Sequence, residues 1–168
     1  MDVRLTDAGP DDLPLIERWL QAEDVSRYWG GAEENVKLLR AEAGAGQWRA
    51  VIEVDGRKAG LVLWQHPTRR ELDEAGLRDV PESVVDIDIM IGEADSRGRG
   101  AGSAAIRLVA GIALADQKVP YVIAAAEVDN RASQRAFEKA GFVVDREFDD
   151  VPYGRCVLMV KRRGGGGK

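Results

Sequence analysis

The stretch Arg97-Gly98-Arg99-Gly100-Ala101-Gly102 decides the fold, because it joins the apolar run Val84 to Ile91 to the alanine-rich run Ser103 to Ala115. The first run predicts a buried strand, and the second predicts a helix. Glycines at a helix start expose backbone N–H groups, which bind anions such as a pyrophosphate. The stretch lacks the Gly-Lys-Ser/Thr of a P-loop, and its glycines do not follow the Gly-x-Gly-x-x-Gly register. It reads Arg-x-x-Gly-x-Gly instead.

A second motif lies downstream, where Asn130-Arg131-Ala132-Ser133 is followed by Phe137-Glu138-Lys139-Ala140-Gly141-Phe142. Asp129 or Asn130 can satisfy the first N–H groups of a helix, and Gly141 can take the left-handed conformation at its end. Taken alone, each motif also fits a structural role, as a tight connection or as a well-capped helix. Their order and spacing carry the functional interpretation.

Together the two motifs resemble the GNAT superfamily of N-acetyltransferases, in which Arg-x-x-Gly-x-Gly binds the pyrophosphate of acyl-CoA and an Asn-x-x-Ala/Ser motif precedes Tyr-Glu-Lys-x-Gly-Phe. The resemblance implies acetyl-CoA as cosubstrate and a backbone N–H near Met90 or Ile91 that polarises the acetyl carbonyl. The residues that it implies in acetyl-CoA binding are Met90, Ile91, Arg97, Gly98, Arg99, Gly100, Ala101, Gly102, Asn130, Ser133 and Phe137.

Phe137 departs from the family pattern. The motif usually carries a tyrosine there, which can protonate the departing CoA thiolate, whereas phenylalanine has no exchangeable proton. Tyr153 is an alternative general acid, and a thiolate with a pKa near 8 to 9 can also leave without one.

The predicted elements follow the order β-α-α-β-β-β-α-β-α-β-β, which is also the GNAT order. Asp55-Gly56 predicts a two-residue hairpin turn between strands at 47–54 and 57–65. The polar segment 66–83 is expected to be a loop with one short helix at 68–75. We therefore expect an α/β fold with a mixed central sheet of about seven strands flanked by about four helices. Residues 1–163 should form a single acetyltransferase domain, and residues 164–168 a flexible glycine-rich tail.

Composition narrows the class of protein. The chain has 168 residues, 45% of them hydrophobic, and no apolar run approaches the roughly twenty residues of a membrane helix. The N-terminus lacks a secretory signal pattern, and a single cysteine, Cys156, cannot form an internal disulfide, so a cytoplasmic location is expected. A net charge of −5 argues against nucleic-acid partners and suits a cationic substrate. The sequence contains no Cys/His cluster of the kind that binds a metal, so no metal site is expected. The protein should be a monomer or a homodimer.

A narrower resemblance is to aminoglycoside 6'-N-acetyltransferases, antibiotic-resistance enzymes. Tyr28-Trp29-Gly30-Gly31 is similar to their aromatic Trp-Gly-Gly segment, and Asp88 lies ten residues before Gly98, as does their strand aspartate. Glu127 precedes Asn130 where the family places an acidic residue facing the acceptor. The resemblance implies direct acetyl transfer to a primary amine of an aminoglycoside, in a ternary complex.

The carboxylates give this chemistry a physical basis, because a primary ammonium must lose a proton before its nitrogen can attack a thioester. Asp88 is the first candidate for the base, and Glu127 is the second catalytic candidate. Strand alternation predicts that Asp86, Asp88 and Met90 share one face. Acids in the polar segment and late in the chain could line the acceptor site: Glu71, Asp73, Glu74, Asp79, Glu82, Asp149 and Asp150. The residues predicted to bind substrate are Tyr28, Trp29, Asp86, Asp149 and Asp150.

Other interpretations stay open at this point. Asp86 and Asp88 could be solvated residues on an exposed face. His66, at the end of a predicted strand, would favour an N-hydroxylysine acceptor if it faced the site, and a protein N-terminus is a further acceptor. Because Phe137 cannot act as a general acid, a non-catalytic acyl-CoA-binding sensor is also a possible function.

Overall fold

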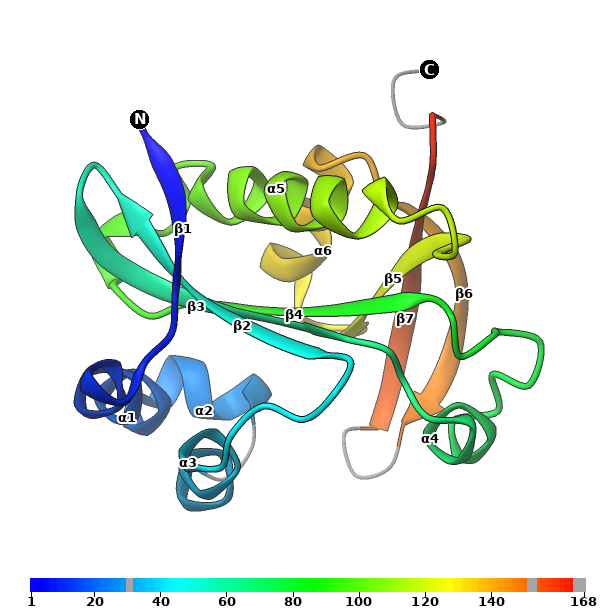
Figure 1. The fold of residues 1–168 in the computed structure, drawn as a ribbon, viewed down its shortest axis with the longest axis horizontal. Helices are drawn as coiled ribbons and strands as arrows, with labels where there is room; N and C mark the ends of the chain where they lie inside the picture. Colours follow the sequence, from blue (N-terminus) through cyan, green and yellow to red (C-terminus); the bar gives the residue numbers. More distant parts are fainter. Residues whose placement is uncertain (30–31, 151–153, 165–168) are drawn as a thin grey trace. The chain divides into compact units, whose positions relative to one another are not determined.

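The computed structural model describes residues 1–29, 32–150 and 154–164. The chain forms two compact units: unit 1 comprises residues 1–63 and 89–105, and unit 2 comprises residues 64–88 and 106–168. The described elements, labelled in Figure 1, are β1 (Val3–Asp7), η1 (Pro10–Asp12), α1 (Leu13–Gln21), α2 (Glu23–Trp29), α3 (Ala32–Arg40), β2 (Gln47–Val54), β3 (Arg57–Gln65), α4 (Arg69–Glu74), β4 (Val85–Ile91), η2 (Ala94–Ser96), α5 (Ala101–Ala115), β5 (Tyr121–Glu127), α6 (Arg131–Lys139), β6 (Val143–Asp150) and β7 (Gly154–Arg162).

The sheet has the mixed character that the sequence predicts. Its seven strands hydrogen-bond in the order β1-β2-β3-β4-β5-β7-β6. β4 and β5 pair in parallel, whereas β1 with β2, β5 with β7 and β6 with β7 are antiparallel. The described residues contain six α-helices, two more than the four or so expected. One of them, α4, corresponds to the short helix expected at 68–75, whereas α2 was not predicted, since the aromatic Trp-Gly-Gly segment indicated only a break after the first helix.

Unit 1 contains the β2–β3 hairpin and the first three helices. Asp55 and Gly56 form its turn with φ of 50° and 81°, which confirms the predicted turn. Figure 1 shows α1, α2 and α3 on one face of β1, β2 and β3. Trp19 of α1 lies 2% exposed at the centre of this contact, against Leu61 of β3 and Met90 of β4.

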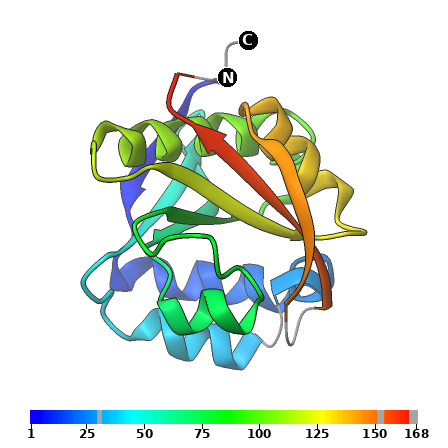
Figure 2. The same ribbon diagram turned by 90° about the vertical axis from the view of Figure 1, so that its right-hand side faces the viewer.

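Unit 2 is built on β5, β7 and β6, which lie side by side in Figure 2. The polar segment between β3 and β4 belongs to its core and is not a loose loop. Leu72, Leu77, Val80 and Val84 are buried together with the β5–β7–β6 residues Ile123, Phe148, Cys156, Leu158 and Val160. The acidic residues of this segment therefore lie on a part of the chain that packs against the core of unit 2.

Candidate active site

The glycine stretch between β4 and α5 has the backbone geometry that anion binding needs. Gly98 and Gly100 have φ of 71° and 88°, and α5 begins at the next residue, Ala101. These left-handed conformations favour glycine, since other residues adopt them only with strain. Within the described part of the chain, the N–H groups of Gly98, Gly100 and Gly102 have no hydrogen-bond acceptor. A run of free N–H groups at the start of a fifteen-residue helix suits a phosphate.

Arg97 supports this stretch from within unit 1. Its Nε donates to the carbonyl of Ile91 at 2.8 Å and its Nη2 donates to the carbonyl of Gly92 at 3.2 Å. Its Nη1 forms an ion pair with Asp24 of α2. The guanidinium thus fixes the chain after β4, whereas the side chain of Arg99 is exposed. Of the two predicted phosphate-binding arginines, Arg99 is the one whose position is open to a ligand.

The other predicted residues of unit 1 pack around the end of β4. Trp29 donates its indole N–H to the carbonyl of Ile89 at 3.3 Å. The Arg27 guanidinium lies over the ring of half-buried Tyr28, 5.2 Å from its centre. Met90 is buried against α1, and the Ile91 carbonyl accepts from Arg97. Gly30 and Gly31 of the same aromatic segment lie outside the described residues.

Unit 2 brings together carboxylates from three elements. On β4, Val85 and Ile87 are buried, whereas Asp86 is half-buried and Asp88 is exposed, as the predicted alternation requires. The β4–β5 register consists of Val85 with Val122 and Asp86 with Ile123 in the described strands, so Asp88 lies beyond this pairing.

The electrostatic surroundings of these acids are unusual. The pKa of Asp88 is raised to about 6, first by the surrounding protein, which disfavours the charged form, and then by Asp150 and Glu71. Asp88 has an exposed surface even though desolvation is the largest cause, which fits a carboxyl that solvent reaches on one side and protein encloses on the others. Burial and Asp88 raise the pKa of Asp86 well above its ordinary value.

Asp150, at the end of β6, completes this acidic group. Burial and the nearby Glu71 raise its pKa. Asp149 points elsewhere, because neighbouring strand residues face opposite sides; it is exposed and pairs with Arg155 at 3.2 Å. Glu71 of α4 was named among many acids but not singled out. Its signal in the sequence is the Thr68-x-x-Glu71 capping box, which fixes its position. We call Glu71, Asp86, Asp88 and Asp150 the acidic group.

Glu127 and the α6 residues form a separate part of unit 2. The Glu127 carbonyl accepts from the Asn130 N–H at 2.9 Å, and the Glu127 side chain is not among the charges that shift Asp88 in the described residues. Asn130 caps α6 by accepting from the Ser133 N–H at 3.2 Å. Gln134, which the sequence did not single out, is buried and donates to the carbonyls of Glu127 and Val128 at 3.0 and 3.1 Å. Gln134 and Asn130 hold the turn between β5 and α6.

Comparison with known proteins decides the family. The family model of the acetyltransferase (GNAT) domain matches residues 9–150, most of the chain. The chain belongs to the GNAT acetyltransferase family. This confirms the resemblance and the prediction of an acetyl-CoA-dependent N-acetyltransferase.

Solved structures share this GNAT fold. AAC(6')-Ib in complex with ribostamycin and coenzyme A is 21% identical, with a TM-score of 0.81 over 100% of this chain and 97% of that one. The same protein with coenzyme A and kanamycin is 20% identical, with a TM-score of 0.80 over 98% and 96%. Spermidine N-acetyltransferase from Vibrio cholerae, in complex with CoA and spermine, is 15% identical, with a TM-score of 0.73 over 99% and 98%.

In this GNAT domain, Phe137 is a core residue. It is 2% exposed and its ring meets Phe142 edge-on, with centres 5.1 Å apart and an interplanar angle of 73°. A side chain in this position stabilises α6, and it carries no proton for a leaving thiolate. Tyr153, the alternative acid, lies outside the described residues.

Two other reactive side chains of the GNAT domain, Cys156 and His66, make contacts within the protein. Cys156 is buried in β7, and desolvation, followed by Asp150, Glu127 and Asp149, raises the pKa of its thiol to about 11. The nucleophilic thiolate is therefore disfavoured. The Nδ1 atom of His66 lies 2.9 Å from the carbonyl oxygen of Val84. Among the described residues, no His, Cys, Asp or Glu group is arranged to hold a metal ion, and no helix has the length and apolarity to span a membrane.

Proposed function

We propose that this protein transfers the acetyl group of acetyl-CoA to a primary amine of a polycationic acceptor, the 6'-amino group of an aminoglycoside. The observation that carries the proposal is Asp88, an accessible carboxylate with a raised pKa among other carboxylates, on the strand that leads to the glycine stretch. Its three acidic neighbours give a net negative site that favours a substrate with several positive charges. The ribostamycin- and kanamycin-bound relatives support this class of acceptor.

In the proposed reaction, Asp88 accepts a proton from the substrate ammonium, directly or through a water molecule. The freed amine nitrogen forms a bond to the thioester carbon, the C–S bond breaks, and the CoA thiolate leaves and takes up the second proton, which the nitrogen loses as the amide forms. A carboxylate with a pKa of about 6 is mostly ionised at neutral pH and is a stronger base than an ordinary aspartate. Asp88 is therefore suited to this step.

The glycine stretch would hold the acetyl-CoA pyrophosphate through the N–H groups of Gly98, Gly100, Ala101 and Gly102. A backbone N–H near Met90 or Ile91 would stabilise the oxyanion as it develops on the thioester oxygen. The transfer is direct in this proposal, because Cys156 is buried and its thiol stays protonated at neutral pH. Detection of acetyl-Cys156 during turnover would contradict direct transfer.

A linear polyamine is the second candidate acceptor. The spermidine N-acetyltransferase of Vibrio cholerae, solved with spermine, has the same fold. The acidic group would suit a chain of ammonium groups as well as an aminoglycoside. An open site that takes extended amines would accept spermine in preference to kanamycin.

The deciding experiment measures release of free CoA thiol from acetyl-CoA with kanamycin, tobramycin, gentamicin, spermine, N-hydroxylysine and a short peptide. Asp88→Asn is compared with Asp149→Asn, a matched control whose carboxylate pairs with Arg155. Aminoglycoside turnover that is lost only in Asp88→Asn supports the proposal, and mass spectrometry of the product locates the acetyl group. Retained acetyl-CoA binding without thiol release for any amine would favour the sensor.

Protection of cells would connect this activity with a cytoplasmic resistance role. Bacteria expressing the wild-type chain should tolerate kanamycin better than bacteria expressing Asp88→Asn at equal protein levels. Equal tolerance in the two strains would contradict the resistance role.

A further inference from the structure

Glu71 is held firmly at the start of α4. Thr68 Oγ1 accepts from the Glu71 N–H at 3.1 Å, and Glu71 Oε1 accepts from the Thr68 N–H at 3.2 Å and from its hydroxyl at 2.9 Å. This reciprocal capping box removes much of the rotamer freedom of the Glu71 side chain. The position of the Glu71 carboxylate therefore follows the position of α4.

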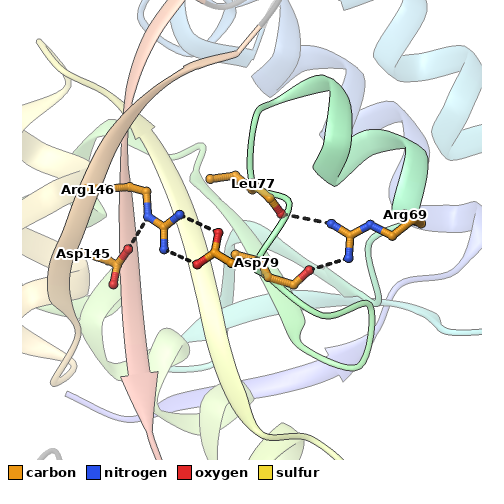
Figure 3. A network of polar contacts seen from close by, with 6 residues as sticks. Arg69, Leu77, Asp79, Asp145 and Arg146 are labelled. Atoms are coloured by element: carbon orange, nitrogen blue, oxygen red, sulfur yellow. Dashed lines mark hydrogen bonds and ion pairs between the residues drawn. The ribbon is translucent and has the colours of Figure 1, made fainter.

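Arg69 joins α4 to the chain that follows it. Its Nη2 donates to the carbonyl of Leu77 at 3.0 Å (Figure 3), and its Nη1 donates to the carbonyl of Val80 at 2.8 Å. Its Nε pairs with Asp73 at 2.9 Å within the same helix. The two carbonyls flank Asp79, so α4 and the segment that carries Asp79 are tied together.

Asp79 in turn binds Arg146 of β6 through both carboxylate oxygens. The two N···O distances are 2.7 Å, and Arg146 Nε contacts Asp145 at 2.5 Å (Figure 3). The hydrogen bond from Arg146 is the largest cause that lowers the pKa of Asp79 to about 2. A bidentate pair fixes direction as well as distance. β6 is also the strand that ends in Asp150, so this pair connects two elements of the acidic group.

We propose that the Arg146–Asp79 ion pair is a positioning device, which holds Glu71 of α4 at a fixed place relative to Asp150 of β6 and Asp88 of β4 and so favours acceptors with two or more ammonium groups. The acceptor preference rests on the proposed function. Carboxylates at fixed separations bind a polyammonium substrate without losing further freedom on binding. A monoamine needs only the base Asp88, so its binding gains little from the other carboxylates of the acidic group.

The charges that face Asp88 make the proposal testable. They are Asp86 from its own strand, Asp150 from β6 and Glu71 from α4. Neither Asp79 nor Arg146 is among the described charges that shift Asp88. An effect of the ion pair on Asp88 must therefore pass through the position of Glu71 or Asp150.

The first test is a carboxyl ¹³C NMR titration of Asp88, which needs no turnover. Asp79→Asn and Glu71→Gln should both lower the pKa of Asp88, and the double variant should lower it no further, because both changes remove the same charge from its neighbourhood. Glu74→Gln is the matched control on the same helix, since Glu74 pairs outward with Arg70, and it should leave Asp88 unchanged. Glutamine keeps a capping acceptor for Thr68 in Glu71→Gln.

An unchanged Asp88 pKa in either Glu71→Gln or Asp79→Asn would overturn the proposal, as would additive shifts in the double variant. Arg146→Lys serves if Asp79→Asn does not fold, because lysine keeps the charge but loses the bidentate geometry. It should lower the Asp88 pKa as Asp79→Asn does.

The second test compares acceptors kinetically. The KM for kanamycin should rise about fivefold in Asp79→Asn and in Glu71→Gln, the upper range for an exposed ion pair, while the KM for glucosamine, a monoamine, stays unchanged. Equal effects on both acceptors would overturn the preference. Wild-type protein that releases no thiol with any amine would overturn the proposed function and the preference with it, and the titration would still decide the positioning role.

Discussion

Replacing Asp88 by asparagine should remove most of the activity and change its dependence on pH. A positioned general base contributes about 10² to 10⁴ in rate, so kcat/KM for the acceptor should fall by that factor. The wild-type base works only when ionised, and its pKa is about 6. Activity of the wild-type protein should therefore fall about tenfold for each pH unit below that pKa, and this acidic limb should vanish in the variant.

The same substitution should stabilise the protein at neutral pH. The folded-state pKa of Asp88, about 6, lies above its ordinary value of 3.8, so the folded protein binds the proton more tightly than the unfolded chain. By linkage, stability falls as pH rises between these two values, and the whole loss is present above pH 6. Asparagine has no charge to desolvate. The Tm advantage of Asp88→Asn should grow from pH 4 to pH 6 and then stay constant.

Thermal unfolding between pH 4 and 8 measures this difference, and CoA thiol release between pH 5 and 8.5 measures the rate. Asp149→Asn is the control for both, because its carboxylate is exposed and paired with Arg155. An acidic limb that persists in Asp88→Asn would show that another group is the base. A variant that is less stable than the wild-type protein at pH 7 would refute the argument from desolvation.

Substitutions at three further positions test the arguments from backbone conformation, packing and helix capping. Gly98→Ala adds a Cβ that meets no atom within 4 Å, but at a φ of 71° the alanine backbone is strained. The substitution should therefore lower the free energy of unfolding by about 1 to 2 kcal/mol and weaken acetyl-CoA binding. An unchanged Kd by calorimetry would show that the glycine stretch is not part of the cosubstrate site. Gly92→Ala places a Cβ 2.1 Å from the Trp19 ring and should destabilise unit 1 by about 1 to 3 kcal/mol, seen as a lower urea midpoint. Asn130→Ala should lose about 1 kcal/mol of capping in the same assay, whereas Asn130→Asp, which keeps the acceptor for Ser133, should not.

The parts of the fold that depend on local conformation could be predicted from the sequence. The Asp55-Gly56 turn and the glycine stretch before α5 need left-handed residues, and only a few residue types supply them without strain. The strand that carries Asp88 followed from the apolar run Val84 to Ile91. The short helix α4 was expected within the polar segment, although its packing into the core of unit 2 was not.

The partners of long charged side chains could not be predicted. Arg97 was expected to add charge to a phosphate site, but it pairs with Asp24, which is 73 residues away in the sequence. Arg146 likewise pairs with Asp79 across 67 residues. Local sequence contains no signal for such contacts, because each depends on which elements the tertiary fold brings together.

The ion pairs also explain which acids of the polar segment and late strand belong to the candidate site. Asp73, Glu74, Asp79 and Asp149 each lie beside an arginine, so their charge is already neutralised within the described protein. For Asp88 and Asp150, the charged neighbours that shift the pKa are all carboxylates. Such a group costs stability until a cation enters it. Under the proposed function, an acceptor ammonium group offsets this cost when it binds, and Asp88 then takes its proton.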